Sequence, residues 1–472
     1  VGSVITVAGW VNRRRDHGNL IFIDLRDRTG LLQVVFNPEH GEKAHDLAQS
    51  LRSEWVVQVT GKVVARLPGA GNPDLPTGAV ELSVTDLVVL NQSLTPPFEI
   101  SDDVEVEVNT RLKYRFIDLR RPRMQEILKL RHKVTHIMWD HLTEQGFTQV
   151  ETPILIKSTP EGARDYVVPS RVHPGDFYAL PQSPQQLKQL LMVSGVERYF
   201  QIARCFRDED LRADRQPEHT QLDFEMSFVH QDDVMAVVED LYTRIVKETT
   251  PDAVVNGPFV RLTYAESMER FGTDKPDIRF GMELTTITET AATSDARVFQ
   301  AVASSGGSIR GFVAPGCGGY GRKQTDNLTD FAKSSGAQGL VFIALDESAP
   351  SIEGLEDEHI KSPLKKFLSI DVIKKMATEM GAAPGDLMLI VAGTSKLVNT
   401  VLSNLRNEMA KRLEMVDPKN LAFTWVYDFP LFEWDEDLKK YEPAHHVFSA
   451  PKPEHMEYLD TDPGKVIGTL WD

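Results

Sequence analysis

A charged segment between Arg198 and Phe228 carries residue types that could hold a phosphate and an amine together. Two alternating apolar and polar stretches flank a loop that is rich in Arg, Asp and Glu. A guanidinium such as that of Arg207 can hold a phosphate through two parallel hydrogen bonds. A carboxylate at Asp223 or Glu225 can hold an ammonium group. The segment therefore predicts a polar ligand site on an antiparallel pair of strands, although a solvated charged hairpin is the plainer interpretation.

The alternation predicts which side chains of this hairpin face the site and which face a core. The core face should carry Phe200, Ile202, Arg204, Phe206, Leu222, Phe224, Met226 and Phe228. The site face should carry Gln201, Ala203, Cys205, Arg207, Gln221, Asp223, Glu225 and Ser227.

This string resembles motif 2 of the class II aminoacyl-tRNA synthetases, in the form found in bacterial aspartyl-tRNA synthetases. The resemblance implies that Arg207 is the catalytic residue, holding the α-phosphate of ATP and the substrate carboxylate. It gives Asp223 the substrate ammonium, and it gives further ATP contacts to Asp208, Glu209 and Gln216. Attack of a carboxylate on the α-phosphorus joins two anions, so an Arg and Mg²⁺ would offset the charge and catalysis would rest on positioning.

A second segment, Leu180–Gln189, predicts which amino acid is bound. An aspartate pocket must neutralise a side-chain carboxylate and reject the isosteric amide, and a cation does both. Lys188 lies three residues after Gln185, on the same helical face. A lone Lys on a helix is usually exposed, but the Gln-Ser-Pro-Gln string resembles the aspartate pocket of the same family. The resemblance assigns Lys188 to the side-chain carboxylate and also gives Ser183 and Gln185 contacts with the substrate.

Two further segments resemble parts of that pocket. Ser158–Tyr166 resembles the mobile loop that closes over the amino acid, and Glu161 matches the family's ligand for the amino group. His445 and His446 resemble paired histidines near the site, although Val447 stands where the family usually has Pro. An ordinary pair of core or surface histidines is the alternative. A zinc site is not favoured, because no further Cys or His lies at ligand spacing.

The N-terminal segment combines a basic run with strand-like aromatic sequence. Recognition of single-stranded RNA needs an aromatic platform with a basic rim. Phe22 is the stacking candidate, and a place in the core is an equal alternative from the alternation alone. The segment resembles the family's anticodon-binding barrel, with expected RNA contacts from Arg13, Arg14, Arg15, Arg26, Gln33 and Glu81. At the position of His17, relatives differ with whether tRNA(Asn) is charged besides tRNA(Asp), and His resembles the relaxed group.

The elements that must position these residues predict a multidomain α+β protein. Strands at Ser3–Val11, Leu20–Leu25, Leu31–Phe36, Trp55–Ala65 and Ala79–Leu90, with a helix at Glu42–Leu51, predict a five-stranded OB-fold β-barrel. We also expect a helix from Arg111 to Gln145, a helix at Ser183–Ser194, a helix at Asp232–Lys247 and a strand at Phe423–Phe432. Gly146–Pro153 resembles motif 1, which builds the class II dimer interface.

The expected domains follow from these patterns and resemblances. They are an anticodon-binding barrel (1–92), a hinge (93–115), a first part of a class II antiparallel-sheet catalytic domain (116–281), an α+β insertion of the bacterial type (282–390) and a second catalytic part (391–472).

Composition sets the broad class of the protein. The chain has 472 residues, 41% hydrophobic and 26% charged, as in ordinary globular proteins. A net charge of −17 argues against a general nucleic-acid coating protein but permits RNA binding through a local basic surface. Two cysteines form no disulfide framework and fit a reducing cytoplasm.

Taken together, the resemblance implies an aspartate–tRNA ligase that uses ATP and Mg²⁺, acts as a cytoplasmic homodimer and charges tRNA(Asp), with tRNA(Asn) as a further candidate. We expect the sequence to be cut at both ends, because it begins with Val1 in place of Met with a strand pattern already at Val4–Trp10, and because no Gly-x-Asp-Arg string of motif 3 occurs in it. Asp472 loosely matches an acid near the Mg²⁺ site. The alternative function is a catalytically incomplete RNA-binding protein that uses only the barrel.

Overall fold

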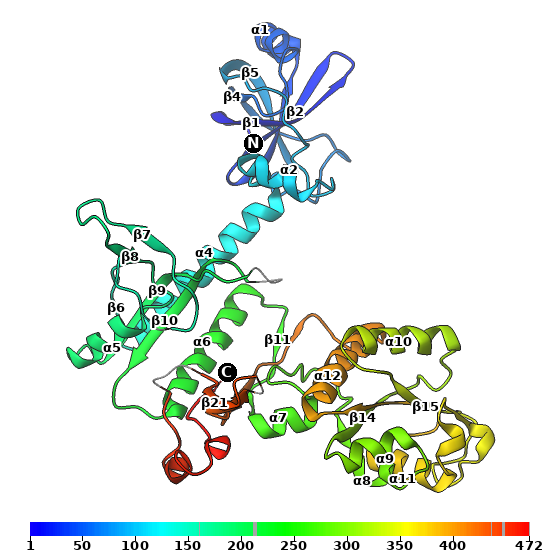
Figure 1. The fold of residues 1–472 in the computed structure, drawn as a ribbon. Coiled ribbons are helices and arrows are strands. Elements are labelled where there is room, and N and C mark those ends of the chain that lie inside the picture. Colours follow the sequence, from blue (N-terminus) through cyan, green and yellow to red (C-terminus); the bar gives the residue numbers. More distant parts are fainter. Residues whose placement is uncertain (160, 211–214, 436, 446–448, 472) are drawn as a thin grey trace. The chain divides into compact units, whose positions relative to one another are not determined.

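The computed structural model describes the chain apart from residues 160, 211–214, 436, 446–448 and 472. It divides into two compact units, Val1–Lys133 and Val134–Asp472 (Figure 1). Each unit has hydrophobic core clusters of its own. No helix of the described residues is long and apolar enough to cross a membrane.

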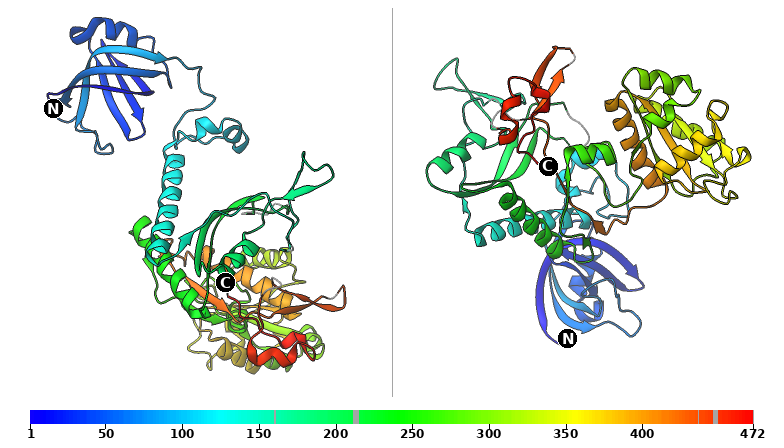
Figure 2. Two further views of the ribbon diagram at one scale, coloured as in Figure 1. Left: turned by 90° about the vertical axis from the view of Figure 1, so that its left-hand side faces the viewer. Right: turned by 90° about the horizontal axis from the view of Figure 1, so that it is seen from below.

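The first unit contains the expected barrel, closed in the order β1-β2-β3-β5-β4. Alternation along its strands turns Val11, Ile23 and Val57 into the core. Helix α1 packs its buried residues on the same core and is visible beside the strands in Figure 2. The elements are β1 (Val4–His17), β2 (Leu20–Asp27), β3 (Gly30–Phe36), α1 (Pro38–Ala48), β4 (Val56–Ala65) and β5 (Val80–Asn91). The five-stranded barrel was therefore predicted correctly.

Helix α1 starts earlier than the expected Glu42, for a local reason. The Asn37 side chain caps the helix by accepting a hydrogen bond from the Glu39 N–H, and Pro38 occupies the first turn. Proline fits there because its missing N–H would have no partner in the helix.

The expected continuous helix from Arg111 to Gln145 is wrong. The chain forms α2 (Val108–Lys113), α3 (Arg115–Asp118) and α4 (Pro122–Glu144) instead. Tyr114 leaves helical geometry, with φ −110° and ψ 44°. Asp118 is fully buried and accepts hydrogen bonds from Arg111 and Arg115, which holds the two short helices together. Pro122 then starts α4, since it could not continue a preceding helix.

The site hairpin belongs to a three-stranded sheet of order β10-β9-β6, made by β6 (Thr148–Gln149), β9 (Arg198–Phe206) and β10 (Glu218–Met226). Its apolar face is confirmed, because Phe200, Leu222, Phe224 and Met226 pack with Leu142 of α4. Phe228 was placed wrongly on this face. The strand ends at Met226, and Phe228 has a positive φ of 59° and is 95% exposed.

The rest of the second unit, outside the insertion body, consists of short strands and helices. They are β7 (Val167–Pro169), β8 (Phe177–Ala179), α5 (Gln185–Val193), α6 (Gln231–Thr249), β11 (Val254–Val255), β12 (Val260–Thr263), α7 (Tyr264–Phe271), β18 (Asn420–Leu421), β19 (Thr424–Tyr427), β20 (Phe432–Asp435), β21 (Lys440–Pro443), η3 (Pro453–Tyr458) and η4 (Pro463–Lys465). The expected strand Phe423–Phe432 is wrong beyond β19, because Asp428 turns the backbone with a φ of 63°.

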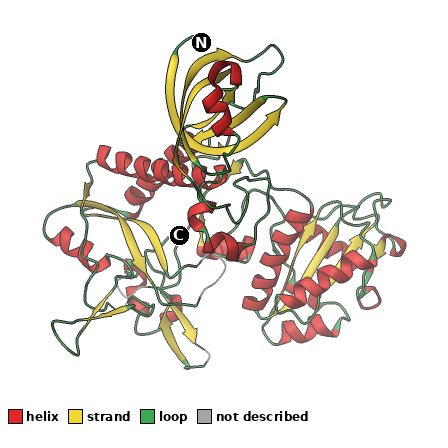
Figure 3. Ribbon diagram, turned by 90° about the horizontal axis from the view of Figure 1, so that it is seen from above, coloured by secondary structure: helices red, strands yellow, loops and turns green. Residues whose placement is uncertain are grey.

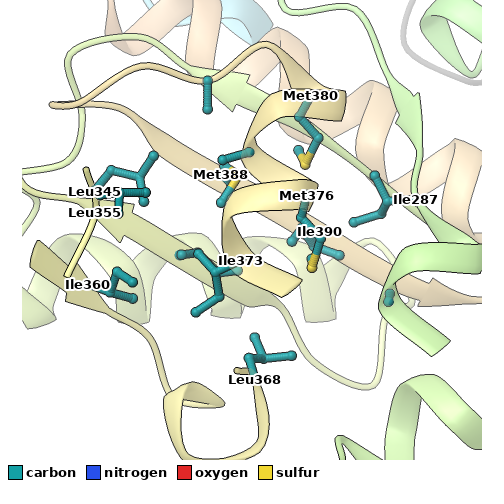
Figure 4. Close-up of a cluster of buried hydrophobic side chains, with 14 of the residues drawn as sticks. Ile287, Leu345, Leu355, Ile360, Leu368, Ile373, Met376, Met380, Met388 and Ile390 are labelled. Atoms are coloured by element: carbon teal, nitrogen blue, oxygen red, sulfur yellow. The ribbon is translucent and has the colours of Figure 1, made fainter. Parts of the chain in front are cut away.

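A five-stranded sheet of order β13-β14-β17-β15-β16 forms the insertion body, with helices on both faces (Figure 3). One face holds the core cluster drawn in Figure 4, which includes Ile287, Ile373 and Met376. The elements are β13 (Thr285–Thr286), α8 (Thr288–Ala292), α9 (Arg297–Ser304), β14 (Ser308–Ala314), α10 (Arg322–Ser334), β15 (Val341–Leu345), η1 (Asp357–His359), β16 (Ile360–Lys361), η2 (Lys365–Phe367), α11 (Ile370–Met380), β17 (Leu387–Gly393) and α12 (Ser395–Arg412).

The insertion body continues past residue 390, where the sequence analysis ended it. That boundary falls inside β17, a strand bonded to neighbours on both sides. Helix α12 then packs Val398, Leu402 and Met409 into the second core cluster of the body. The end must follow α12, because an apolar helix face needs its sheet as a partner.

Arg406 of α12 fixes the start of this body. It is 1% exposed and donates to the main-chain carbonyls of Asp277, Phe280, Gly281 and Met282, at 2.8–3.2 Å. Its guanidinium also lies 4.2 Å from the ring centroid of Phe280. Beside it is an open cavity of about 430 Å³, lined by Asp277, Phe280, Asn407, Ala410, Lys411, Glu414 and Val416.

Candidate active site and RNA-binding surface

Lys188 lies at the centre of the candidate amino-acid site. It is 8% exposed, on α5, and its Nζ donates to Asp223 Oδ1 at 2.9 Å. A second carboxylate, Glu225 Oε2, lies 3.2 Å from the same nitrogen. Asp223 and Glu225 alternate on one face of β10, as the sequence predicted. One cation thus faces two carboxylates, which suits a ligand carrying a further positive charge.

Asp223 has one engaged and one free oxygen. Its Oδ1 accepts from Lys188 and, at 3.1 Å, from Gln221 Nε2. Its Oδ2 is buried without a hydrogen-bond partner among the described residues. A buried carboxylate oxygen is rarely left unpaired, so Oδ2 is a candidate acceptor for a ligand.

Glu161 and Ser183 are brought together as the sequence analysis expected of substrate-binding positions. Ser183 Oγ donates to Glu161 Oε2 at 2.6 Å, and Thr159 Oγ1 donates to Oε1 at 3.0 Å. Gln182 supports the same loop: its amide donates to Asp165 Oδ1 at 2.6 Å and to the carbonyl of Ala163. The loop therefore lies against the segment that leads into α5.

Arg207 follows directly after β9. Its N–H donates to the carbonyl of Pro217 at 2.9 Å, which closes the hairpin across the loop. Its Nε is buried and has no hydrogen-bond partner among the described residues. A guanidinium with an unused donor can take an anionic ligand.

The pKa of the Cys205 thiol is affected by four of the charged residues predicted for the site. Burial is the main cause that raises the pKa of the Cys205 thiol to about 11, and Asp223 and Glu161 also raise it, while Arg207 and Lys188 lower it. The four charged residues predicted for the site therefore all act on the same buried side chain. This agreement supports a single charged site.

The other residues expected to contact ATP make few side-chain interactions among the described residues. Glu209 and Gln216 are exposed, and the described contacts give their side chains no partner. The main chain of Asp208 pairs with Arg164, with Asp208 N donating to Arg164 O at 3.0 Å. Gln185 begins α5. The structure thus joins the expected substrate loop to the hairpin through backbone bonds.

The barrel carries a second candidate surface. Phe22 is half-buried and lies on the side of β2 opposite to the core residues Ile21 and Ile23. It is therefore not part of the barrel core, which was the equal alternative. The ring of His17 meets it edge-on, with centroids 6.1 Å apart.

Polar residues predicted for RNA binding share a face of the barrel with this aromatic ring. Gln33 Nε2 donates to Glu81 Oε2 at 2.7 Å, and Arg15 Nη2 donates to Asp24 Oδ1 at 2.7 Å. Arg15 lies directly opposite Phe22 in the pairing of β1 with β2. Asp24 lies directly opposite Gln33 in the pairing of β2 with β3. Aromatic and hydrogen-bonding groups thus share one barrel face.

The remaining arginines differ in their exposure and in the partners of their guanidinium groups. Arg13 is exposed, and Arg14 pairs with Asp16 at 2.8 Å. Arg26 is held by Asn12 Oδ1 and by the buried Glu54, both at 2.6 Å. Glu54 also accepts a hydrogen bond from Arg120, whose guanidinium lies over Trp10. Arg26 therefore has a structural partner that the sequence did not reveal.

Comparison with known families identifies both parts of the chain. Residues 5–90 match the family described as OB-fold nucleic acid binding domain. Residues 107–472 match the family described as tRNA synthetases class II (D, K and N). The chain belongs to the class II tRNA synthetases.

Full-length similarity narrows the resemblance within class II. The aspartate–tRNA(Asp/Asn) ligase of Dehalococcoides mccartyi strain CBDB1 is 53% identical over all of this chain and 79% of its own length. That of Rubrobacter xylanophilus is 51% identical over all of this chain and 77% of its own. The fold is similar to the asparaginyl-tRNA synthetase of Pyrococcus horikoshii complexed with asparaginyl-adenylate, at a TM-score of 0.50 and 19% identity over 85% of this chain and 92% of that one.

Two residues expected to act in this class II synthetase, His446 and Asp472, lie outside the described residues. His445 packs edge-on against Phe429, with ring centroids 5.3 Å apart, and no described contact joins it to the hairpin. Within the described ranges, no group of three or more His, Cys, Asp or Glu side chains could hold a metal ion.

Sequence reasoning missed Tyr199 at the hairpin site and Arg66 on the barrel of the synthetase. Tyr199 and Gln201 are buried beside Asp223, and the alternation that placed Gln201 on the site face applies to Tyr199 as well. Arg66 lies at the edge of the barrel surface, where its Nε donates to the carbonyl of Val80 and its Nη2 is buried without a partner among the described residues. An isolated Arg after a strand gives no distinctive sequence signal.

Proposed function

We propose that the protein is an aspartate–tRNA ligase. It activates L-aspartate with ATP to form aspartyl-adenylate and then transfers the aspartyl group to the 3′ end of tRNA. The observation that carries this proposal is Lys188, a buried cation held against Asp223 at the floor of the motif 2 hairpin. Membership of the class II family and full-length similarity to aspartate–tRNA(Asp/Asn) ligases support it.

Lys188 selects aspartate by exchanging one partner. Asp223 is 3% exposed and stays with the lysine, whereas the Glu225 side chain is 28% exposed and can turn to water. The side-chain carboxylate of aspartate takes the place of Glu225 on Nζ. Asparagine cannot do so equally well, because its amide carries no charge and its NH₂ would face another donor.

The α-ammonium of aspartate binds among carboxylates. Asp223 Oδ2 is the buried unpaired acceptor, and Glu161, held by Ser183, comes from the loop that closes over the substrate. A cation there offsets the excess negative charge of Asp223 and Glu225 beside a single lysine. Gln185 and His445 complete the proposed aspartate-binding set.

Arg207 holds the α-phosphate of ATP and the attacking carboxylate together. The carboxylate oxygen attacks the α-phosphorus, pyrophosphate leaves, and the mixed anhydride forms without a general base because the nucleophile is already ionised. A tRNA 3′-terminal hydroxyl then attacks the acyl carbon and AMP leaves. Glu209 and Gln216 complete the proposed ATP contacts. Mg²⁺ arrives as the counter-ion of ATP, and no step is assigned to a metal held by the described residues.

The barrel binds the anticodon of tRNA, with Phe22 as the stacking platform. His17 beside it supports charging of both tRNA(Asp) and tRNA(Asn), the pair named for the relatives. A homodimer is proposed through the motif 1 region, where α4 exposes Leu130 and Trp139, at 48% and 42%. The proposed location is the cytoplasm, where tRNA is charged for translation.

Aspartate-dependent exchange of pyrophosphate into ATP tests the function. Exchange with aspartate, and at least a hundredfold less with asparagine or lysine, is expected from a charge-reading pocket. Absence of exchange together with tRNA binding would instead favour an RNA-binding protein that uses the barrel alone. Charging assays with purified tRNA(Asp) and tRNA(Asn) test the relaxed specificity, and failure to charge tRNA(Asn) would contradict it.

A further inference from the structure

Gln201 organises a buried hydrogen-bond network beneath the candidate aspartate site. Its Oε1 accepts from Tyr199 Oη at 2.9 Å, from Thr152 N at 3.1 Å and from Thr152 Oγ1 at 3.0 Å. Tyr199 is 0% exposed and Gln201 is 9% exposed. Because both donors of Thr152 converge on one oxygen, the amide of Gln201 is fixed in place.

This network lies directly beside Asp223. Gln201 and Asp223 are opposite each other in the ladder of β9 and β10, and Tyr199 is two residues away on the same face of β9. Burial raises the pKa of the Tyr199 hydroxyl above its usual value, and the Asp223 carboxylate raises the pKa further, both through its charge and as a second hydrogen-bond partner within reach of the hydroxyl. The hydroxyl is therefore a close neighbour of the carboxylate.

The Tyr199 hydroxyl has one proton and two possible acceptors. It donates to Gln201, while Asp223 Oδ2 remains buried without a partner among the described residues. A phenol normally donates to a neighbouring carboxylate, because hydrogen bonds to charged acceptors are the stronger ones. Something must hold the proton away from Asp223, and the fixed oxygen of Gln201 is the group in position to do so.

We propose that Gln201 is a positioning residue for aspartate binding: it keeps the Tyr199 proton directed away from Asp223, so that Oδ2 stays available for the substrate ammonium. The inference rests on the proposed function, in which Asp223 receives that ammonium. Thr152 has a supporting part, since its two donors set the position of the Gln201 oxygen. Neither Gln201 nor Tyr199 touches the substrate in this arrangement.

Removal of the Gln201 acceptor releases the competing proton. In Gln201→Leu, the Tyr199 hydroxyl turns to Asp223 Oδ2 and must be displaced by the ammonium of each aspartate that binds. A hydrogen bond to a charged group is worth enough to raise KM for aspartate about ten- to a hundredfold. KM for ATP and kcat for exchange should change by less than about threefold, because Arg207 is not part of the network.

The double variant Tyr199→Phe/Gln201→Leu separates this role from a purely structural one. Without the hydroxyl there is no competitor, so KM for aspartate should return to within about threefold of wild type. Tyr199→Phe alone should leave KM unchanged or lower it. Arg204→Gln is the matched control: it removes a half-exposed ion pair with Glu218 on the same hairpin, leaves the network intact, and should leave KM for aspartate near wild type.

Pyrophosphate exchange at varied aspartate, with thermal unfolding of each variant, is the measurement. Persistence of the KM defect in the double variant would overturn the proposal, as would a wild-type KM in Gln201→Leu. If Gln201→Leu fails to fold, Tyr199→Phe still decides, because a raised KM would make the hydroxyl a ligand and not a competitor. Loss of aspartate-dependent exchange in the wild-type protein would instead contradict the proposed function itself.

Discussion

Lys188 combines two roles that are usually separate, since it is both a buried structural cation and the proposed reader of the substrate. Its partners Asp223 and Glu225 lie at 2.9 and 3.2 Å. Breaking a buried pair by removing one partner leaves an uncompensated charge. Stability and specificity therefore depend on the same nitrogen.

We predict that Lys188→Met lowers the free energy of unfolding by about 3–5 kcal/mol and abolishes aspartate-dependent exchange. Arg204→Gln on the same hairpin is the matched control, because Arg204 and Glu218 form a pair that is about half exposed, at 50% and 53%. It should change the free energy of unfolding by less than about 1 kcal/mol. Denaturant titration checks both, and equal losses would contradict the burial argument.

Cys205 provides a pH-dependent prediction. Its folded-state pKa is raised to about 11, chiefly by burial, so the folded protein keeps the thiol protonated after the unfolded chain has lost its proton. The stabilisation is fully present below the unfolded pKa of about 8.5 and is lost as pH rises towards 11. The difference in unfolding free energy between wild type and Cys205→Ala should shrink over that range. A constant difference would count against the raised pKa.

At the scale of elements, two buried arginines fix the insertion body to the chain around it. Arg406 donates to main-chain carbonyls at the start of the body. Arg310 of β14, 3% exposed, donates to the carbonyls of Met268 and Glu269 in the last turn of α7. Carbonyls at a helix end lack partners within the helix, so Arg310 supplies a donor to the Glu269 carbonyl, while the Met268 carbonyl also accepts from the Gly272 N–H.

We predict that Arg406→Met lowers the free energy of unfolding by about 3 kcal/mol or more, because several buried carbonyls lose their donor at once. Arg412→Met on the same helix serves as the control, since Arg412 pairs with the partly exposed Glu408. Hydrogen exchange in residues 277–283 should rise in the first variant alone. Equal exchange in both variants would show that Arg406 is not the anchor.

Elements with a local signal could be predicted from the sequence, and those fixed by distant partners could not. The barrel strands, the α6 helix and the apolar face of the motif 2 hairpin follow from alternation and periodicity. The break of the expected long helix also has a local cause in Pro122, which was overlooked.

Long-range contacts set the limits at the sites. Lys188, Asp223 and Glu161 could be proposed as site residues because each lies in a distinctive string. The partner of Arg26 is Glu54, which lies in the connection between α1 and β4. The hydrogen-bond network of Tyr199 and Gln201 includes Thr152, about fifty residues earlier in the chain. Pairings across such sequence separations leave no periodic pattern in a single sequence.

At the scale of the whole molecule, the chemistry is divided between the two units. The candidate amino-acid site lies within Val134–Asp472, and the aromatic and polar barrel face lies within Val1–Lys133. With a net charge of −17, attraction to RNA cannot come from the overall field and must come from local groups. Stacking and hydrogen bonding should therefore contribute much of the affinity for tRNA.

We predict that Phe22→Leu weakens tRNA binding by about 1–3 kcal/mol, the usual worth of one base stacked on an aromatic ring. Aspartate-dependent pyrophosphate exchange should be unchanged, because it needs no tRNA and uses the other unit. Filter binding at fixed salt measures the first effect. Leu47→Ala, an exposed apolar change on α1, is the control, and an equal loss there would contradict a specific platform.

The cavity beside Arg406 has a consequence for how the insertion was acquired and how it can be exchanged. Its walls come from Asp277 and Phe280 on one side of the inserted body and from Glu414 and Val416 on the other. The chain thus enters and leaves the inserted body at the same place. A short linker is therefore enough to join the two ends when the body is removed. Excision of 282–413 should leave a soluble remainder by size-exclusion chromatography. Excision of 282–390 would leave α12 with an apolar face and no sheet, and that remainder should aggregate.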